Sequence, residues 1–142
     1  MNAVLFVHLI AIGIWAGCVA TEVVLEIALK KASPQQSGLA LLHARIDRFV
    51  EIPAIVVALL TGGAMLHHAA WDTLLIAKVS LGASAVVLNS TAAFTVHRRL
   101  QCLNAQDMAG YQRFNRLHER IGIGCVLSIA GAIAVGGYRI AV

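Results

Sequence analysis

The first apolar stretch of the chain, residues 3–21, reads AVLFVHLIAIGIWAGCVAT. An α-helix needs about 20 predominantly apolar residues to cross a hydrocarbon core, and this stretch is close to that length. Three more apolar stretches of similar length follow at residues 49–66, 73–96 and 121–138. The sequence therefore predicts four membrane-spanning helices.

The composition agrees with a lipid environment. Hydrophobic residues make up 59% of the 142-residue chain and charged residues 13%, and the mean hydropathy is +0.80. Soluble domains are more polar than this. In lipid, only helices and closed barrels satisfy every backbone group, and these stretches lack the alternation of barrel strands. We expect an all-α membrane bundle of four antiparallel helices, with residues 1–142 forming one domain and the lipid bilayer as its surroundings.

Basic residues are concentrated in two of the three expected connections. They are Lys30, Lys31, Arg45, Arg48, Arg98, Arg99, Arg113, Arg116 and Arg120, which make up nine of the eleven lysines and arginines. The positive-inside rule places these connections on the cytoplasmic side and both termini on the opposite side of a bacterial inner membrane. The net charge of +4 is therefore an orientation signal, and we expect no nucleic-acid partner.

The connections are expected to be partly helical. Helical spacing continues through residues 39–42 and 111–120, whereas Ser33-Pro34 and residues 104–110 carry the signals of a break. The start of the chain, MNAVLFVHLI, lacks the basic region of a signal peptide, so we expect the first stretch to be a retained helix.

Two ionisable side chains lie within the outer halves of the predicted spans, His8 in the first and Lys78 in the third. An ionisable group costs several kcal/mol in a membrane unless it is paired or hydrated, so each is a functional candidate. The structural alternatives are a buried histidine bonded to a carbonyl and a lysine whose long stem reaches the outer surface. The cysteines form no CxxC pair, and Cys18 and Cys125 fall at positions where we expect packing, with a thiolate ligand as the alternative.

Acidic and histidine side chains recur every four residues near the predicted cytoplasmic face. Glu22 and Glu26 have this spacing in the first helix, and His43, Asp47 and Glu51 have it in the second. Converging imidazoles and carboxylates hold divalent metals in helix bundles, and mixed nitrogen and oxygen donors suit zinc, iron or manganese. The candidate ligands are Glu22, His43, Asp47, Glu51 and His118.

Two other interpretations of these carboxylates are open. They can neutralise nearby basic side chains, or they can form a path for protons or a substrate. The basic residues in question are Arg45, Arg48, Arg113, Arg116 and Arg120.

Four segments carry a family resemblance along almost the whole chain. They are HLIAIGIWAG at residues 8–17, EIPA at 51–54, the Ala77-Lys78 pair after Trp71, and YQRFN at 111–115. The chain resembles the HemJ family of small bacterial heme-binding membrane proteins, which act as protoporphyrinogen oxidases. More loosely, it is similar to the membrane domain of copper-resistance D proteins. The resemblance implies heme b with His8 as axial ligand, and Lys78 as a nearby cofactor-binding and catalytic group.

The leading functional hypothesis is a heme-binding membrane redox protein that oxidises a porphyrinogen and passes electrons to a quinone or respiratory-chain partner. A heme between His43, His97 and His118 is an alternative position. A second hypothesis is a protein that binds or transports a divalent metal, and a third is a structural subunit of a membrane complex. Four helices leave little room for alternating access, so transport would favour a homo-oligomer.

Overall fold

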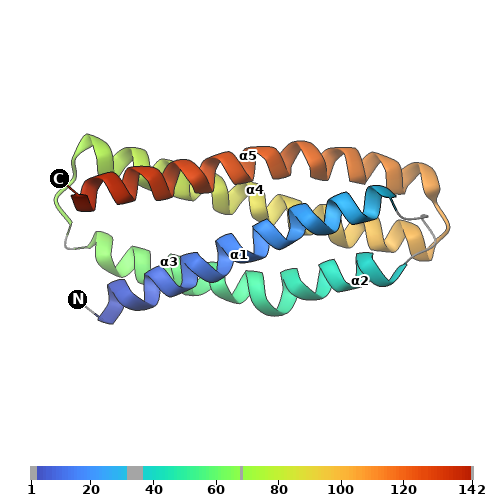
Figure 1. The fold of residues 1–142 in the computed structure, drawn as a ribbon, viewed down its shortest axis with the longest axis horizontal. Helices are drawn as coiled ribbons and strands as arrows, with labels where there is room; N and C mark the ends of the chain where they lie inside the picture. The colour runs from blue at the N-terminus through green and yellow to red at the C-terminus, as the bar shows by residue number, and fades with distance from the viewer. Residues whose placement is uncertain (1–2, 32–36, 68, 142) are drawn as a thin grey trace. The chain divides into compact units, whose positions relative to one another are not determined.

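A computed structural model describes residues 3–31, 37–67 and 69–141, and these residues are almost entirely helical. The elements are α1 (Ala3–Lys31), α2 (Ser37–Ile46), the π-helical segment η1 (Asp47–Glu51), α3 (Ile52–Leu66), α4 (Thr73–Asn104) and α5 (Met108–Ala141). Since α2, η1 and α3 follow one another without interruption, the described chain forms four long helical segments (Figure 1).

Four segments are long and apolar enough to cross a membrane, which confirms that part of the prediction. They are Ala3–Leu29, Gly38–Leu66, Thr73–Asn104 and Met108–Tyr138. The helical continuations at residues 39–42 and 111–120 are also confirmed, as is the break between residues 104 and 110. Ser33-Pro34 lies outside the described residues.

Large apolar side chains cover much of the outer surface. Among the most exposed are Val24, Phe49, Leu60, Val87, Ile123 and Leu127. A contiguous apolar exterior would aggregate in water, but it is the expected surface for helices in lipid. The fold therefore fits a multi-pass membrane protein.

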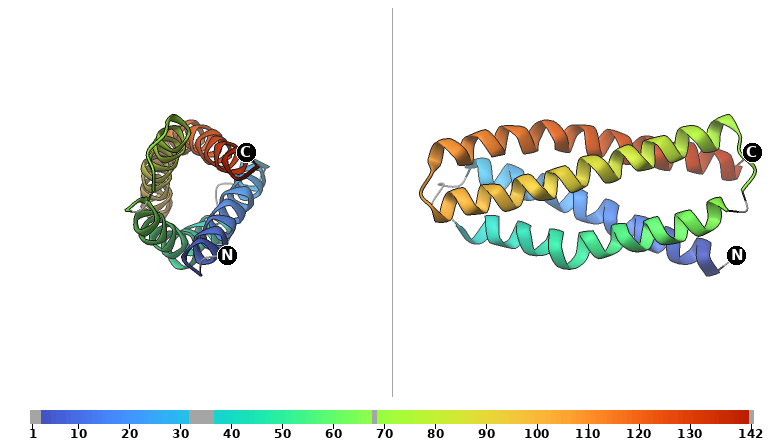
Figure 2. Two further views of the ribbon diagram at one scale, coloured as in Figure 1. Left: turned by 90° about the vertical axis from the view of Figure 1, so that its left-hand side faces the viewer. Right: turned by 180° about the vertical axis from the view of Figure 1, so that it is seen from behind.

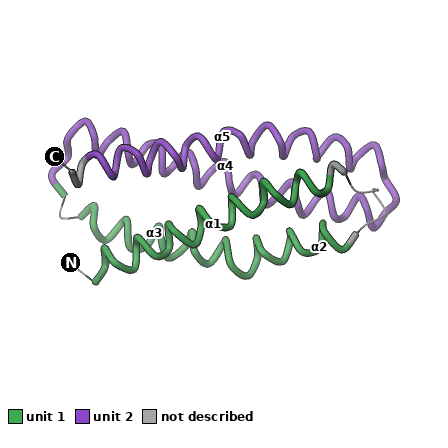
Figure 3. Tube along the Cα trace, in the orientation of Figure 1, with its two compact units in different colours: residues 1–69 green, residues 70–142 purple. Residues whose placement is uncertain are grey.

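The chain divides into two compact units, which we call unit 1 (Met1–Ala69) and unit 2 (Ala70–Val142) (Figure 3). In unit 1, α1 packs against α2, η1 and α3. His8, near the start of α1, contacts residues near the end of α3, whereas Glu26 contacts His43 in α2. Because the start of α1 lies against α3, the other end of α1, with its acidic residues, lies against the histidine of α2.

Unit 2 is a pair of long helices, α4 and α5, which lie side by side in Figures 1 and 2. Asp72 caps α4 by accepting a hydrogen bond from the Leu75 backbone at 2.7 Å. Asp107 accepts one from the Gly110 backbone at 2.9 Å in the first turn of α5. The short connection between the helices includes Gln106, which adopts a φ of 57°. These contacts let one helix end and the next begin within a few residues.

The π turn η1 interrupts the second long helix just before Pro53. The Ile52 N–H donates to the Asp47 carbonyl, one residue further back than in an α-helix. Proline has no N–H and disturbs the helical ladder on its N-terminal side, which accounts for a distortion at this place. Asp47 and Glu51 are the first and last residues of the turn, and both are buried.

The packing of α4 on α5 yields a stability prediction. A Cβ at Gly131 would lie 3.2 Å from Leu81 Cδ1, whereas a Cβ at the exposed Gly137 would meet nothing within 4 Å. Gly131→Leu should therefore destabilise the protein by about 1–3 kcal/mol through overpacking, and Gly137→Leu should not. Thermal unfolding in detergent measures both, and equal melting temperatures for the two variants would contradict the packing described here.

Candidate metal centre

The acidic face of α1 is turned toward α2 and η1 within unit 1. Glu22 and Glu26 are separated by about one turn, so they lie on the same side of the helix. Both carboxylates lie within ion-pairing distance of His43, and both side chains are largely buried, at 12% and 13% exposure. The four-residue spacing of Glu22 and Glu26 therefore places both carboxylates against one residue, His43.

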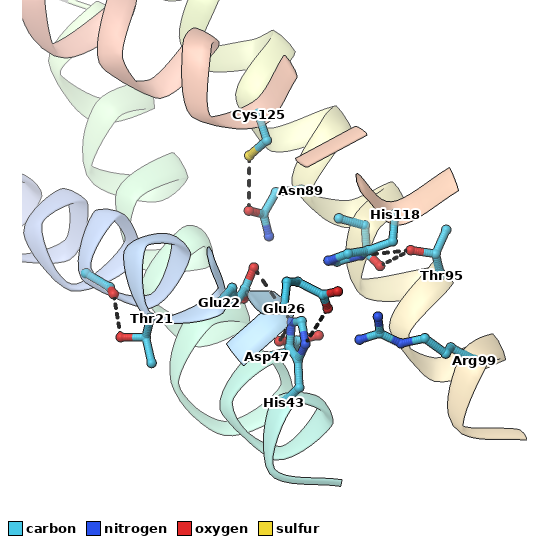
Figure 4. A network of polar contacts seen from close by, with 12 residues as sticks. Thr21, Glu22, Glu26, His43, Asp47, Asn89, Thr95, Arg99, His118 and Cys125 are labelled. Carbon is cyan, nitrogen blue, oxygen red and sulfur yellow. Dashed lines mark hydrogen bonds and ion pairs between the residues drawn. The ribbon is translucent and has the colours of Figure 1, made fainter. Parts of the chain in front are cut away.

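His43 has a different carboxylate on each side of its ring. Nε2 lies 3.8 Å from Glu22 Oε2 and 3.5 Å from Asp47 Oδ1, while Nδ1 lies 3.3 Å from Glu26 Oε1. The His43 side chain is completely buried. Figure 4 shows these four residues converging from the two helical segments of unit 1.

The positions of Asp47 and Glu51 depend on the π turn. In a regular α-helix, residues four apart drift about 40° around the axis, so the face would turn by about 80° between His43 and Glu51. The wider turn of η1 reduces this drift. Asp47 and Glu51 are only 4% and 1% exposed, and both interact with the Glu22 carboxyl group.

Donor atoms of Glu22, His43 and Asp47 all lie within 4.8 Å of one another, which is the arrangement of a metal-binding group. The donors are one imidazole nitrogen and two carboxylate oxygens, a set that zinc, iron and manganese accept. Glu22 Oε1 is buried and accepts no hydrogen bond from the described residues. A cation bound among these atoms would contact this oxygen.

The outer candidate His8 is held within unit 1. Its Nδ1 lies 3.1 Å from the Ala58 carbonyl and 3.0 Å from Thr61 Oγ1. A Cβ at Gly62 would lie 3.2 Å from His8 Cε1, so the glycine leaves room for the ring. The structure thus places His8 in the carbonyl-bonded environment that the sequence offered as its structural alternative, and this contact also orients the ring.

Lys78 belongs to unit 2. Its Nζ would lie 3.2 Å from a Cβ at Gly136, so the lysine stem packs along α5 where that helix has no side chain. His8 and Lys78 therefore lie in different units. Each side chain packs against a glycine of the helix beside it, which is Gly62 for His8 and Gly136 for Lys78. The heme-related roles of both residues stay predictions.

His118, the remaining predicted ligand, also belongs to unit 2. It is buried, and its Nδ1 lies 3.0 Å from Thr95 Oγ1. His97 is exposed and contacts Gln101 Nε2 at 3.0 Å. The two histidines therefore differ in exposure, and a heme between His43, His97 and His118 stays a prediction.

A buried polar network in unit 2 was not predicted. Arg99 was counted only as an orientation charge, yet it is completely buried and donates to Asn115 Oδ1 at 2.8 Å. Asn115 in turn donates to Glu119 Oε1 at 3.0 Å, and the Cys125 thiol donates to Asn89 Oδ1 at 3.3 Å.

The signal for this network was the helical spacing along one face of α4. The buried residues Ala85, Asn89, Ala92, Val96 and Arg99 recur every three or four positions. Arg98 lies off this face, is exposed, and has its guanidinium 5.5 Å from the Phe114 ring. Periodicity therefore distinguishes the buried arginine from its exposed neighbour.

Comparison with known proteins adds no family assignment, since no protein-family model, curated protein or solved structure matches this chain.

Proposed function

We propose that this chain is an integral membrane protein that binds a divalent metal ion in unit 1, with Glu22, His43 and Asp47 as ligands. The observation that carries the proposal is the grouping of their donor atoms within 4.8 Å. The site lies between two of the four helices that span the membrane in the proposed topology, so the proposed function is metal binding or transport at a membrane.

The orientation of His43 supports this function. A histidine that binds metal through one ring nitrogen usually donates the other N–H to a carboxylate or carbonyl. Here Nε2 faces Glu22 and Asp47, and Nδ1 faces Glu26. We assign Nε2 as the ligand atom and Glu26 as the residue that orients the ring.

Charge balance also supports a cation. Glu22, Glu26 and Asp47 surround one imidazole, which carries at most one positive charge. Buried carboxylates are costly unless they are paired or coordinate a metal. The basic residues of the same helical segment, Arg45 and Arg48, are exposed. A divalent ion bound between Glu22, His43 and Asp47 would place positive charge beside these carboxylates.

The first prediction concerns metal content. Glu22→Gln, His43→Ala and Asp47→Asn should each abolish near-stoichiometric zinc, iron or manganese, because each removes a ligand. Glu26→Gln should keep the metal but weaken its affinity about 10–100-fold, since it removes an orienting partner. Mass spectrometry of the purified proteins and competition with a chelator measure these effects.

Matched controls are available in unit 2. Glu119→Gln repeats the carboxylate change and His97→Ala repeats the histidine change outside unit 1. Both should retain the wild-type metal content. A metal-free wild type, purified after expression with ample metal, would retire the proposal.

We further propose that all four helices run antiparallel in a bacterial inner membrane, with both termini on the non-cytoplasmic side. The concentration of basic residues in two connections supports this topology. Gln106 and Ala70 are exposed residues of the two connections that flank α4, so they report opposite sides.

In a Cys102→Ser background, an impermeant thiol reagent applied to intact spheroplasts should label Ala70→Cys and leave Gln106→Cys unlabelled until the membrane is opened. The reverse pattern would overturn the orientation. Cys18 and Cys125 are buried and should contribute only a constant background.

A second candidate function is heme binding with a redox role, and the orientation of His8 favours it. Because Nδ1 is held at 3.1 Å from the Ala58 carbonyl, Nε2 is the atom that would bind iron. Axial histidines are commonly oriented by such a bond. The heme would supply the redox chemistry, with a porphyrinogen as proposed substrate and a quinone as proposed acceptor, and the chain would supply the axial ligand and an apolar enclosure.

If His8 binds heme, protein purified after expression with ample heme should have a Soret band that weakens strongly in His8→Ala. The exposed His67 provides the control, and His67→Ala should leave the band unchanged. A colourless wild type would exclude this function. Loss of the band in His43→Ala or His118→Ala, with His8→Ala unaffected, would place the heme elsewhere.

A further inference from the structure

One nitrogen of the His8 ring faces two polar groups of α3. Nδ1 lies 3.1 Å from the Ala58 carbonyl oxygen and 3.0 Å from the Thr61 hydroxyl oxygen. Ala58 and Thr61 are three residues apart, so they lie on the same side of the helix. All three residues belong to unit 1. The ring is therefore held at Nδ1 by two neighbouring groups of one helix.

The Thr61 hydroxyl group has another target for its proton. Oγ1 donates to the Val57 carbonyl at 2.6 Å, and the Ala58 carbonyl lies 3.2 Å from it. A hydroxyl group has one proton to donate and two lone pairs that accept. Since the short contact with Val57 uses the proton, Thr61 presents a lone pair to His8 Nδ1. The Ala58 carbonyl is an acceptor as well, because it has no proton.

These contacts decide which nitrogen of the neutral His8 ring carries the proton. An unprotonated Nδ1 would place its lone pair against the Ala58 carbonyl oxygen, and Thr61 would have to give up its bond to Val57 to donate to it. A protonated Nδ1 satisfies both acceptors. The proton of the neutral ring is therefore on Nδ1, and Nε2 carries the lone pair.

Gly62 sets how closely the His8 ring approaches α3. A Cβ at Gly62 would lie 3.2 Å from His8 Cε1, the carbon between the two ring nitrogens. A Cβ at the next residue, Gly63, would meet nothing within 4 Å. One added methyl group at Gly62 therefore pushes the ring away from its acceptors, whereas the same change at Gly63 leaves it in place.

We propose that Thr61 is a positioning residue for His8, which keeps the proton on Nδ1 and makes Nε2 the nitrogen that binds a metal. Two acceptors restrict the rotation of the ring, and the hydrogen bond at Nδ1 makes Nε2 a stronger electron donor. The position of the proton follows from the hydrogen bonds alone. Its effect on iron rests on the proposed heme function, in which a stronger donor stabilises ferric iron and lowers the reduction potential.

Nitrogen-15 NMR tests the position of the proton without heme, because protonated and unprotonated imidazole nitrogens have different chemical shifts. Full-length protein labelled at its six histidines is measured in detergent, at a pH at which the ring is neutral. The His8 signals are those that are missing in His8→Ala. Wild type and Thr61→Ser should carry the proton on Nδ1. Thr61→Val should lose part of this preference, because only the Ala58 carbonyl then remains as an acceptor.

Heme-loaded protein provides the second measurement. Thr61→Val should bind heme about 10-fold more weakly and shift its reduction potential to a more positive value, whereas Thr61→Ser should keep the wild-type values. Gly62→Ala should act in the same direction as Thr61→Val. Gly63→Ala is its matched control and should behave as wild type. Size-exclusion chromatography and circular dichroism establish that each variant is folded.

The outcomes separate this inference from the proposed heme function. A proton on Nε2 in wild type would overturn the assignment of the ring. Wild-type NMR signals and heme binding in Thr61→Val would overturn the role of Thr61. A colourless wild type would exclude heme at His8, and the NMR comparison of Thr61→Val with wild type then decides the inference by itself.

Discussion

The ring of His43 lies between carboxylates on both edges, at 3.3 Å from Glu26, 3.5 Å from Asp47 and 3.8 Å from Glu22. Because the side chain has no exposure to solvent, water cannot screen or replace these contacts. This contact holds the acidic end of α1 against the histidine of α2, since breaking a buried ion pair costs several kcal/mol.

The π turn η1, just before Pro53, positions two carboxylates close to His43 and Glu22. It contributes Asp47 and Glu51 from a distorted segment between two regular helices, and both side chains are buried on the side of α1. A wider helical turn is energetically poorer than a regular one, and such turns occur frequently at functional sites. Here Pro53 accounts for the distortion. The wider turn keeps the carboxylates of Asp47 and Glu51 on one face of the helix.

The buried polar side chains of the two units differ in type and in the contacts they make. In unit 2, hydrogen bonds join donors to acceptors, as in Arg99 to Asn115 and Thr95 to His118. These hydrogen bonds join α4 to α5 and stabilise the packing of the two helices. In unit 1, three carboxylates converge on His43, and donor atoms of Glu22, His43 and Asp47 lie within 4.8 Å of one another. This grouping supports the proposed metal function, whereas the orientation of His8 supports heme as the second candidate.

The sequence by itself determined the number of helices long and apolar enough to span a membrane, because lipid requires long apolar stretches whose backbone groups bond internally. The helices extend beyond the apolar stretches, as in Ala3–Leu29, where residues 3–21 were expected. It also indicated the ligand types, since Glu22, Glu26, His43 and Asp47 stand at helical spacing. Only the tertiary structure decided that Glu26 faces the opposite ring nitrogen from Glu22 and Asp47, and that Glu51 joins through a π turn. Spacing places residues on a face of one helix, but which atoms meet depends on the rotation and register of the helix packed against it.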